Sequence, residues 1–368
     1  MGPLFWGLVG LSAIVVVHEF GHYWLARRAG VRVEVFSVGF GPELFGYSDQ
    51  AGTRWRFSLI PLGGYVKMFG QSDLGPDSDG TQMTEAERAV SFNHKKLSQK
   101  TAIVAAGPLA NIIFSIAIFT ILFSTVGQQF TPAKVSEVVV GSAADAAGLE
   151  PGDEFLKVAG RSIARFEEVR DIIISYPGIP VDIVVNRAGR EIDLVAKPKP
   201  LIVPDGLGGE TRIGLLGVKA KERAFERHSL PVAAWQGVRE IISFISLTAT
   251  GIRQMFAQQR SPTEMVGPLG IAQILDKAAD YGIVTVMMIL AKLSISIGLV
   301  NLLPIPILDG GHLAFYAYES VVRRPPAQWV KELLFKIGLV FVLGLMLFVI
   351  FNDFTRFPMV QRFFALFV

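Results

Sequence analysis

Four long apolar stretches constrain the fold of this chain more than any other feature of its sequence. They cover residues 3–26, 101–126, 282–303 and 332–351, and the last of them reads ELLFKIGLVFVLGLMLFVIF. A helix needs roughly 20 apolar residues to cross a bilayer. Of the 368 residues, 51% are hydrophobic and only 18% are charged, which is too apolar for an ordinary soluble enzyme. We therefore predict a polytopic α-helical membrane protein with about four spans that contacts the lipid bilayer directly.

Basic residues beside these stretches predict the orientation of the chain. Arg27, Arg28 and Arg32 follow the first stretch, His94, Lys95, Lys96 and Lys100 precede the second, and Arg323, Arg324 and Lys331 lie between the last two. Loops rich in Lys and Arg stay on the cytoplasmic side. Both termini and the long 127–281 segment are then expected outside. The net charge of only +3 fits such anchoring residues and predicts no nucleic-acid partner.

Segment 229–257 is the ambiguous part of this topology. It is helical in pattern and apolar, but it contains Arg239, Glu240 and Arg253. It could be a fifth span or an amphipathic helix lying on the membrane surface. A fifth span would invert the last basic loop, so we favour the interfacial helix.

Two non-helical regions interrupt the apolar stretches. Residues 31–70 alternate apolar and polar residues around glycine-rich turns, which predicts a β-hairpin sheet. Its apolar composition favours a sheet dipping toward the membrane over a small cytosolic sheet. Residues 141–163, GSAADAAGLEPGDEFLKVAGRSI, carry a Gly-Leu-x-Pro-Gly-Asp pattern that resembles a bacterial PDZ domain of α+β type. A generic β-hairpin domain is the alternative.

The predicted organisation has four segments. They are the first two spans with the membrane-associated hairpin (1–126), the PDZ domain (127–200), a linker with the amphipathic helix (201–281), and the last two spans (282–368). The chain has no cysteine, which excludes a disulfide framework and a thiol nucleophile.

The most informative motif lies within the first span. Residues His18 to His22 read H-E-F-G-H, and ionisable groups inside a membrane span are candidates for a functional site. Positions i and i+4 of a helix differ by only about 40° of rotation, so both imidazoles can bind one metal ion. Glu19 lies beside them, where its carboxylate can accept a proton from an attacking water. The bland alternative is a charged cluster at the membrane interface.

A catalytic zinc site usually has three protein ligands. The segment NLLPIPILDGGH, residues 301–312, supplies candidates at the end of the third apolar stretch. Irregular backbone at membrane depth is tolerated only where it lines a protein or water cavity. The predicted topology places this segment and the end of the first stretch on the same side of the membrane. We expect Asp309 to be the third ligand, and His312 is the competing one.

Together these motifs resemble the site-2 protease family of intramembrane zinc metalloproteases. The resemblance rests on H-E-x-x-H, on N-x-x-P-x-x-x-L-D-G around Asp309, on the PDZ-like insert, and on the segments AAGPLAN (105–111) and VGPLGI (266–271). It covers nearly the whole chain. One departure is that only a single Gly-Leu-x-Pro-Gly-Asp pattern is present, whereas many relatives carry two PDZ domains.

The resemblance implies roles for individual residues. Zn²⁺ would be bound by His18, His22 and Asp309, Glu19 would be the general base, and Asn301 would hold the substrate backbone. The hairpin would be a membrane-reentrant sheet that pairs with an unwound substrate. Its implied substrate-binding residues lie in SVGFGPELF and FSLIPLGGYVKM: Gly39, Phe40, Gly63, Gly64 and Tyr65.

The same resemblance implies a biological setting. The chain would lie in the bacterial inner membrane, with the PDZ domain in the periplasm and the active site toward the cytoplasm. Its substrates would be single-pass membrane proteins, such as an anti-sigma factor, and leftover signal peptides, and a peptide could bind in the PDZ groove. A metal transporter and a membrane-tethered PDZ scaffold are the alternatives. The first should show internal repeats, which we do not find, and the second has no need for Glu19.

Overall fold

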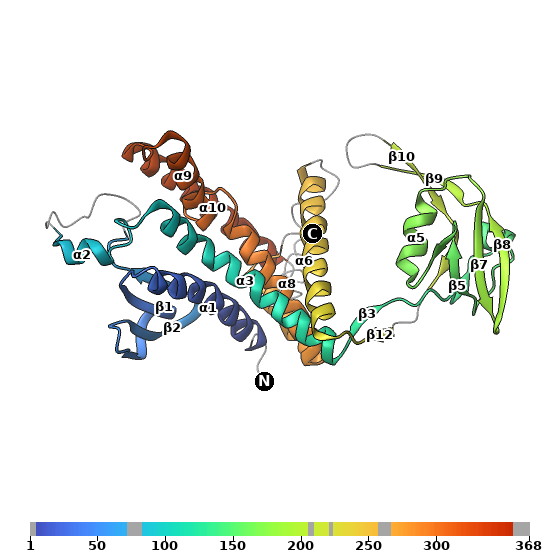
Figure 1. The fold of residues 1–368 in the computed structure, drawn as a ribbon, viewed down its shortest axis with the longest axis horizontal. Helices are drawn as coiled ribbons and strands as arrows, with labels where there is room; N and C mark the ends of the chain where they lie inside the picture. Colours follow the sequence, from blue (N-terminus) through green and yellow to red (C-terminus); the bar gives the residue numbers. More distant parts are fainter. Residues whose placement is uncertain (1–4, 72–82, 205–209, 221–223, 257–265, 356–368) are drawn as a thin grey trace, which may run out of the picture. The chain divides into compact units, whose positions relative to one another are not determined.

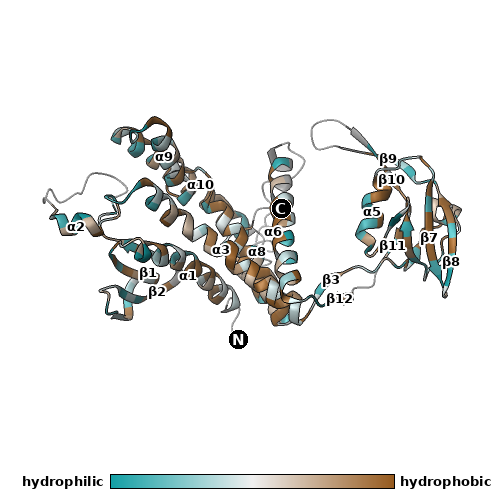
Figure 2. Ribbon diagram, in the orientation of Figure 1, coloured by the Kyte–Doolittle hydropathy of each residue, from teal (hydrophilic) through white to brown (hydrophobic). Residues whose placement is uncertain are grey.

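Four helices dominate the computed structural model, which describes residues 5–71, 83–204, 210–220, 224–256 and 266–355 (Figure 1). Within this described part, four helical segments are long and apolar enough to cross a membrane: Trp6–Arg28, Leu97–Thr125, Ile283–Asn301 and Gln328–Phe354. They belong to α1 (Phe5–Arg28), α3 (Leu97–Thr125), α8 (Ile283–Asn301) and α10 (Gln328–Thr355). The predicted number of spans is confirmed. Figure 2 shows α3, α8 and α10 as predominantly hydrophobic.

Segment 229–257 forms one long helix, α6 (Leu230–Phe256). It is not among the four candidate spans of the described chain. Its placement at the membrane surface stays a prediction. Some parts of the segments predicted from the sequence lie outside the described residues. They are residues 1–4, 72–82, 205–209, 221–223, 257–265 and 356–368.

The chain divides into two compact units. One contains residues 1–119, 237–244 and 262–368, and the other contains residues 120–236 and 245–261. The first unit therefore holds α1, most of α3, and the helices that follow residue 266. These are α7 (Pro268–Asp280), α8, α9 (Asp309–Val322) and α10.

The predicted hairpin over 31–70 is present in the first unit. β1 (Val33–Ser48) pairs antiparallel with β2 (Arg54–Met68), and together they form a two-stranded sheet. The register shifts repeatedly along the pair, which indicates bulges. Its far half exposes large apolar side chains: Phe40, Leu44, Phe45, Tyr47, Phe57, Leu59 and Ile60. A short helix, α2 (Glu85–Val90), follows it in the chain and begins with a capping box at Thr84.

A buried carboxylate fixes α7 within the first unit. Asp353 of α10 is only 3% exposed, and its two oxygens accept hydrogen bonds of 2.9 Å from the backbone N–H groups of Gly267 and Gly270. These N–H groups lie at the first turn of α7, where no intrahelical partner exists. α7 then packs closely on α1, because a Cβ at Gly7 would lie 2.4 Å from the Cβ of Ala272.

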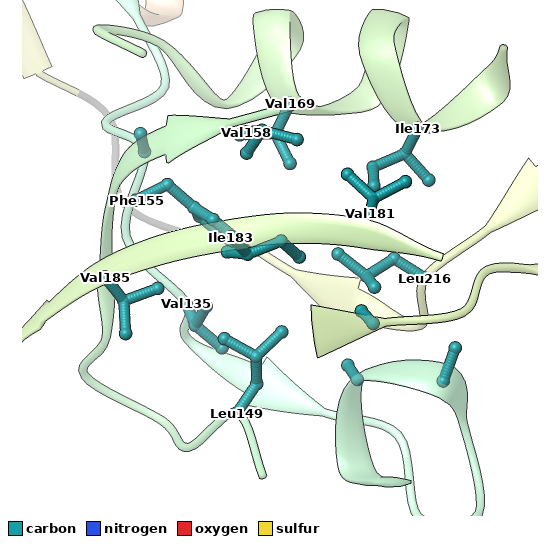
Figure 3. Packing of buried hydrophobic residues seen from close by; sticks show 14 residues of the cluster. Val135, Leu149, Phe155, Val158, Val169, Ile173, Val181, Ile183, Val185 and Leu216 are labelled. Atoms are coloured by element: carbon teal, nitrogen blue, oxygen red, sulfur yellow. The ribbon is translucent and has the colours of Figure 1, made fainter. Parts of the chain in front are cut away.

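The second unit contains an α+β body inserted between α3 and α6. Its four-stranded antiparallel sheet has the order β6 (Arg161–Ser162), β5 (Glu154–Val158), β7 (Val181–Arg187) and β8 (Arg190–Ala196). Helix α5 (Phe166–Ile174) and the short α4 (Ala143–Ala146) complete it. Figure 3 shows how side chains of α5, the sheet and the neighbouring segments interdigitate in one core.

The core of this body continues beyond the predicted domain boundary at residue 200. β9 (Lys199–Pro204) pairs with β10 (Glu210–Leu215), and β11 (Val218–Lys219) pairs with β4 (Glu137–Val138). Leu216 is 4% exposed and belongs to the same hydrophobic cluster as Val135 (Figure 3). The segment after residue 200 is therefore needed to close the body.

The Gly-Leu-x-Pro-Gly-Asp pattern has a structural explanation in an ion pair. Asp153 is fully buried, and both of its oxygens accept hydrogen bonds of 2.7 Å from the guanidinium of Arg187. It also accepts a bond from the backbone N–H of Glu150. Burial raises the pKa of the Asp153 carboxyl, but the hydrogen bonds from Arg187 and Glu150 outweigh it, so the pKa lies below its ordinary value. The motif thus fixes the loop before β5.

A narrow neck joins the inserted body to the helices. β3 (Gln128–Phe130) follows α3 directly and pairs antiparallel with β12 (Ala224–Glu226), which precedes α6. Phe130 lies opposite Ala224 and Gln128 opposite Glu226. The chain therefore enters and leaves the inserted body through one pair of adjacent short strands.

Candidate active site

His18 and His22 lie one turn apart on α1 and point to one place. Both are buried, at 7% and 8% exposure, and their Nε2 atoms are 3.2 Å apart. The i, i+4 spacing on a helix produces this convergence. Two unprotonated imidazole nitrogens at this distance can bind the same cation.

Asp309 adds an oxygen to this pair. Its Oδ2 lies 3.1 Å from His18 Nε2 and 3.5 Å from His22 Nε2. Two ligand atoms that each lie about 2.0–2.1 Å from a tetrahedral zinc ion are roughly 3.3 Å apart. The three observed separations bracket this value. Among the described residues, Asp309 Oδ2 is buried without a hydrogen-bond donor, so a cation would satisfy it. These residues form a group that fits zinc.

The turn between α8 and α9 delivers Asp309 to the histidines. Asp309 is the first residue of α9, and Ile307, two residues before it, has φ of 96°. Positive φ is a genuine outlier for a β-branched residue and marks strain near a functional site. Gly310 and Gly311 allow close contact, because a Cβ on them would lie 2.1 Å from the Leu303 carbonyl oxygen and 2.5 Å from that of Ile305.

His312, the competing ligand, lies elsewhere on α9. It lines the same cavity, but it is not part of the cluster of ligand atoms found in the described structure. Its ring lies against Phe335 of α10, with centroids 5.5 Å apart. The geometry therefore favours Asp309 over His312 as the third ligand.

A cavity of about 770 Å³ opens beside the three ligand candidates. Most of the residues predicted to take part in the reaction line it: His18, Glu19, His22, Gly63, Gly64, Tyr65, Asn301 and Asp309. The side chain of Glu19 lies beside β2, because a Cβ at Gly64 would be 3.7 Å from its Cγ. The Nδ2 of Asn301 lies 3.5 Å from His18 Nε2. The hairpin and the end of α8 thus meet at the metal-binding group.

Gly39 and Phe40 are not among the residues that line this cavity. The Phe40 ring stacks on Tyr65 with centroids 6.2 Å apart. Gly39 has φ of 91°, and a Cβ there would lie 2.6 Å from the carbonyl oxygen of Ile60. Both residues shape the hairpin, and the structure brings only Gly63, Gly64 and Tyr65 of the predicted hairpin residues to the cavity.

Helix α3 supplies two contacts to the imidazoles that sequence reasoning missed. The carbonyl oxygen of Ile103 accepts a hydrogen bond of 2.9 Å from His22 Nδ1. Gly107 faces both rings, because a Cβ there would lie 2.2 Å from His22 Nε2 and 2.8 Å from His18 Nε2. A backbone carbonyl leaves no signal in a sequence. Gly107 belongs to the segment AAGPLAN, which resembles the site-2 protease family. That resemblance does not predict the contact of Gly107 with the two imidazoles.

Gly107→Ala should disrupt the metal-binding group. The added methyl must displace both imidazoles, so we expect the zinc content of purified protein to fall at least tenfold. Gly344→Ala is the matched control, because nothing lies within 4 Å of a Cβ at Gly344 and alanine is the better helix former. Zinc is measured by mass spectrometry in the same detergent. Full zinc occupancy in Gly107→Ala would contradict the close contact of α3 with the two imidazoles.

Comparisons with known proteins identify the family of the chain. The model of the family described as Peptidase family M50 matches residues 6–345. A protein of Agrobacterium fabrum with a zinc-metalloprotease name is 41% identical over 350 residues, which cover 93% of each chain. Metalloprotease MmpA of Caulobacter vibrioides is 36% identical over 373 residues, or 94% of each chain. The chain therefore belongs to peptidase family M50 and is a zinc metalloprotease of the site-2 protease type.

Proposed function

We propose that this protein cleaves single-pass membrane proteins within the bilayer. The observation that carries the proposal is the convergence of two histidines and an aspartate at the ends of apolar membrane helices, beside a carboxylate. A protease that acts on soluble peptides has no need to bury these groups among membrane spans, where their desolvation is expensive. A substrate that itself lies in the membrane explains the location.

We assign zinc binding to His18, His22 and Asp309. When bound, zinc polarises the scissile carbonyl and makes a water acidic enough to attack near neutral pH. Glu19 accepts the proton of that water and passes it to the leaving amine. The neighbouring β2 strand, at Gly64, limits where the Glu19 side chain can lie. Asn301 can donate its amide N–H to the substrate carbonyl, since its Nδ2 lies near the metal ligands.

We propose that β2 holds the substrate next to these groups. Gly63, Gly64, Tyr65 and Val66 line the cavity, and β2 has only β1 as a strand partner within the described structure. An extended peptide can add to the other edge of such a strand. This pairing would stabilise an unwound substrate helix, which must open before its carbonyl can reach the metal. We also place the apolar far half of the hairpin in the membrane.

The positive-inside rule supports a bacterial inner-membrane location with the active site toward the cytoplasm and the inserted body in the periplasm. The substrates we propose are an anti-sigma factor and leftover signal peptides. Both classes are single-pass segments with a helix that must be cut within the bilayer. The basic loops after α1, before α3 and between α9 and α10 carry this assignment.

We propose that the inserted body is a single PDZ domain. A cavity of about 240 Å³ lies between α5 and the segment Ile213–Val218, which reads IGLLGV. Its walls are mainly apolar, with Val169 and Ile173 on α5. Arg170 adds a positive charge, and Gly214 and Gly217 also line the cavity. We expect it to bind a peptide with an apolar carboxyl-terminal residue.

Glu19→Gln should abolish peptide cleavage without affecting zinc binding. The amide keeps the size of the side chain but cannot accept the proton, so we expect cleavage to fall by at least about 100-fold while zinc content stays at the wild-type level. Cleavage of a single-pass substrate is measured in reconstituted vesicles. Phe20→Leu, at a neighbouring residue that is 47% exposed, is the control and should cleave normally. Wild-type cleavage by Glu19→Gln would refute the assignment of the base.

The third ligand is tested by comparing two variants. Asp309→Asn removes the charge that opposes the cation and should lower the zinc content of the purified protein at least tenfold. His312→Ala should leave zinc content within about twofold of wild type, since its ring lies outside the ligand cluster. The reverse order would make His312 the ligand. Equal, mild effects would mean that other residues hold the metal.

Removal of the inserted body tests its independence from the metal site. Because Phe130 lies opposite Ala224, residues 131–223 can be replaced by an Asn-Gly turn that converts the neck into a β-hairpin. We expect unchanged zinc content and cleavage of membrane substrates at least as fast as wild type, with weaker selectivity. The control is the full-length chain with Glu191→Ala, an exposed residue of β8 that does not line the cavity beside α5. Loss of zinc on deletion would show that the inserted body helps form the metal site.

A further inference from the structure

We infer that Asn111 is a positioning residue of the metal site, whose amide oxygen accepts a hydrogen bond from His18 Nδ1. This bond fixes the tautomer that leaves His18 Nε2 free to bind zinc. The inference rests on the ligand set proposed above and adds to it a residue that touches neither metal nor substrate. It concerns a completely buried side chain in the middle of α3, a membrane helix.

The contact between Asn111 and His18 is direct. The side-chain amide lies 3.3 Å from His18 Nδ1 through its Nδ2, and its Oδ1 is buried without any hydrogen-bond partner. Turning the amide by 180° exchanges its two atoms, which have nearly the same shape. Oδ1 then faces Nδ1 and can accept its proton, while Nδ2 takes the position that Oδ1 held.

The chemistry of a metal ligand requires this orientation. A neutral imidazole carries one proton, and Nε2 can bind a metal only if the proton is on Nδ1. Nδ1 then becomes a donor and needs an acceptor. If the amide nitrogen faced the ring instead, the proton would have to sit on Nε2 and would block zinc. Binding of the metal therefore selects the oxygen of Asn111.

His22 shows the same arrangement, in which Nδ1 faces an oxygen acceptor on α3 and Nε2 faces the other ligands. The inference therefore does not rest on the His18 contact alone. Its Nδ1 donates to the carbonyl oxygen of Ile103, which can only accept, so its Nε2 is also left free. Ile103, Gly107 and Asn111 recur every four residues and therefore lie along one side of α3. This row provides an acceptor for His22, clearance for both rings, and an acceptor for His18.

Helix α8 holds the Asn111 backbone in place. The hydroxyl of Ser294 donates to the Asn111 carbonyl at 3.1 Å, and the hydroxyl of Ser115 lies 2.8 Å from the same oxygen and 2.9 Å from that of Ala291. Gly298 lets the helices approach, since a Cβ there would lie 3.3 Å from Asn111 Cβ. The acceptor is thus fixed to the helix whose end carries Asn301.

Two variants of similar size separate an acceptor from a donor at this position. Asn111→Asp keeps an oxygen and cannot donate when ionised, whereas Asn111→Leu can do neither. Zinc affinity of the full-length protein in detergent is measured by competition with a chromogenic chelator. The visible spectrum of the Co²⁺-loaded protein reports ligand geometry. Gly344→Ala serves again as the control, because nothing lies within 4 Å of a Cβ at Gly344.

We expect Asn111→Leu to weaken zinc binding 10–100-fold and to alter the Co²⁺ spectrum, as for other partners of ligating histidines. Asn111→Asp should bind zinc within about threefold of wild type or more tightly. The thermal midpoints of the metal-free proteins should agree, which separates positioning from folding. If Asn111→Leu does not fold, the comparison of Asn111→Asp with wild type still shows whether the side chain at this position acts as an acceptor or as a donor.

Three results would overturn the inference. Wild-type affinity and an unchanged Co²⁺ spectrum in Asn111→Leu would show that no acceptor is needed. An equally severe loss in Asn111→Asp would show that the amide acts as a donor. Failure of the wild-type protein to bind zinc, or undiminished binding by Asp309→Asn, would refute the ligand set itself and would be distinguishable from failure of the Asn111 contact alone.

Discussion

The structure depends on one constraint, which is that polar groups placed among membrane helices must find partners inside the protein. His18 and His22 meet this constraint on both ring nitrogens. Their Nε2 atoms converge with Asp309 Oδ2, and their Nδ1 atoms face α3. Each helix that contributes to this arrangement is thereby tied to the others at one point. This cluster is also a polar centre among otherwise apolar helices.

Small residues allow the helices to approach closely enough for these contacts. A Cβ at Gly21 of α1 would lie 2.3 Å from the Ala106 carbonyl oxygen of α3, and one at Gly107 would collide with both imidazoles. Membrane helices associate mainly through such close packing, because lipid offers no hydrophobic driving force between them. Gly338 of α10 has the same role beside the turn, since a Cβ there would lie 2.3 Å from the carbonyl oxygen of Pro306. The positions of His18 and Asp309 therefore depend on residues that carry no chemistry themselves.

The two irregular parts of the first unit are both placed at the metal-binding group. The turn between α8 and α9 contains the strained Ile307, and the bulged β2 strand lies beside Glu19. Backbone that is not helical leaves N–H and C=O groups unpaired, and at membrane depth these groups can serve only a protein-lined cavity. The inserted body, by contrast, has its own core and joins the helices through the β3–β12 neck.

The sequence alone determined the features that arise from local spacing. Four apolar stretches of span length predicted four membrane helices, and H-E-x-x-H placed two imidazoles and a carboxylate together because one helix sets their separation. The alternation in 31–70 likewise predicted β1 and β2. Asp309 was reached less directly, through a proline-broken segment and the expected side of the membrane.

Tertiary structure decided everything that depends on contacts between distant segments. It separated Asp309 from His312, which are only three residues apart, because the glycine-rich turn directs one toward the histidines and α9 carries the other toward Phe335. It brought Gly63, Gly64 and Tyr65 to the cavity and left Gly39 and Phe40 outside. It also extended the core of the inserted body to Leu216 and set Ile103 and Asn111 behind the two imidazoles. No periodicity records such contacts, since they arise only when helices far apart in the chain pack against each other.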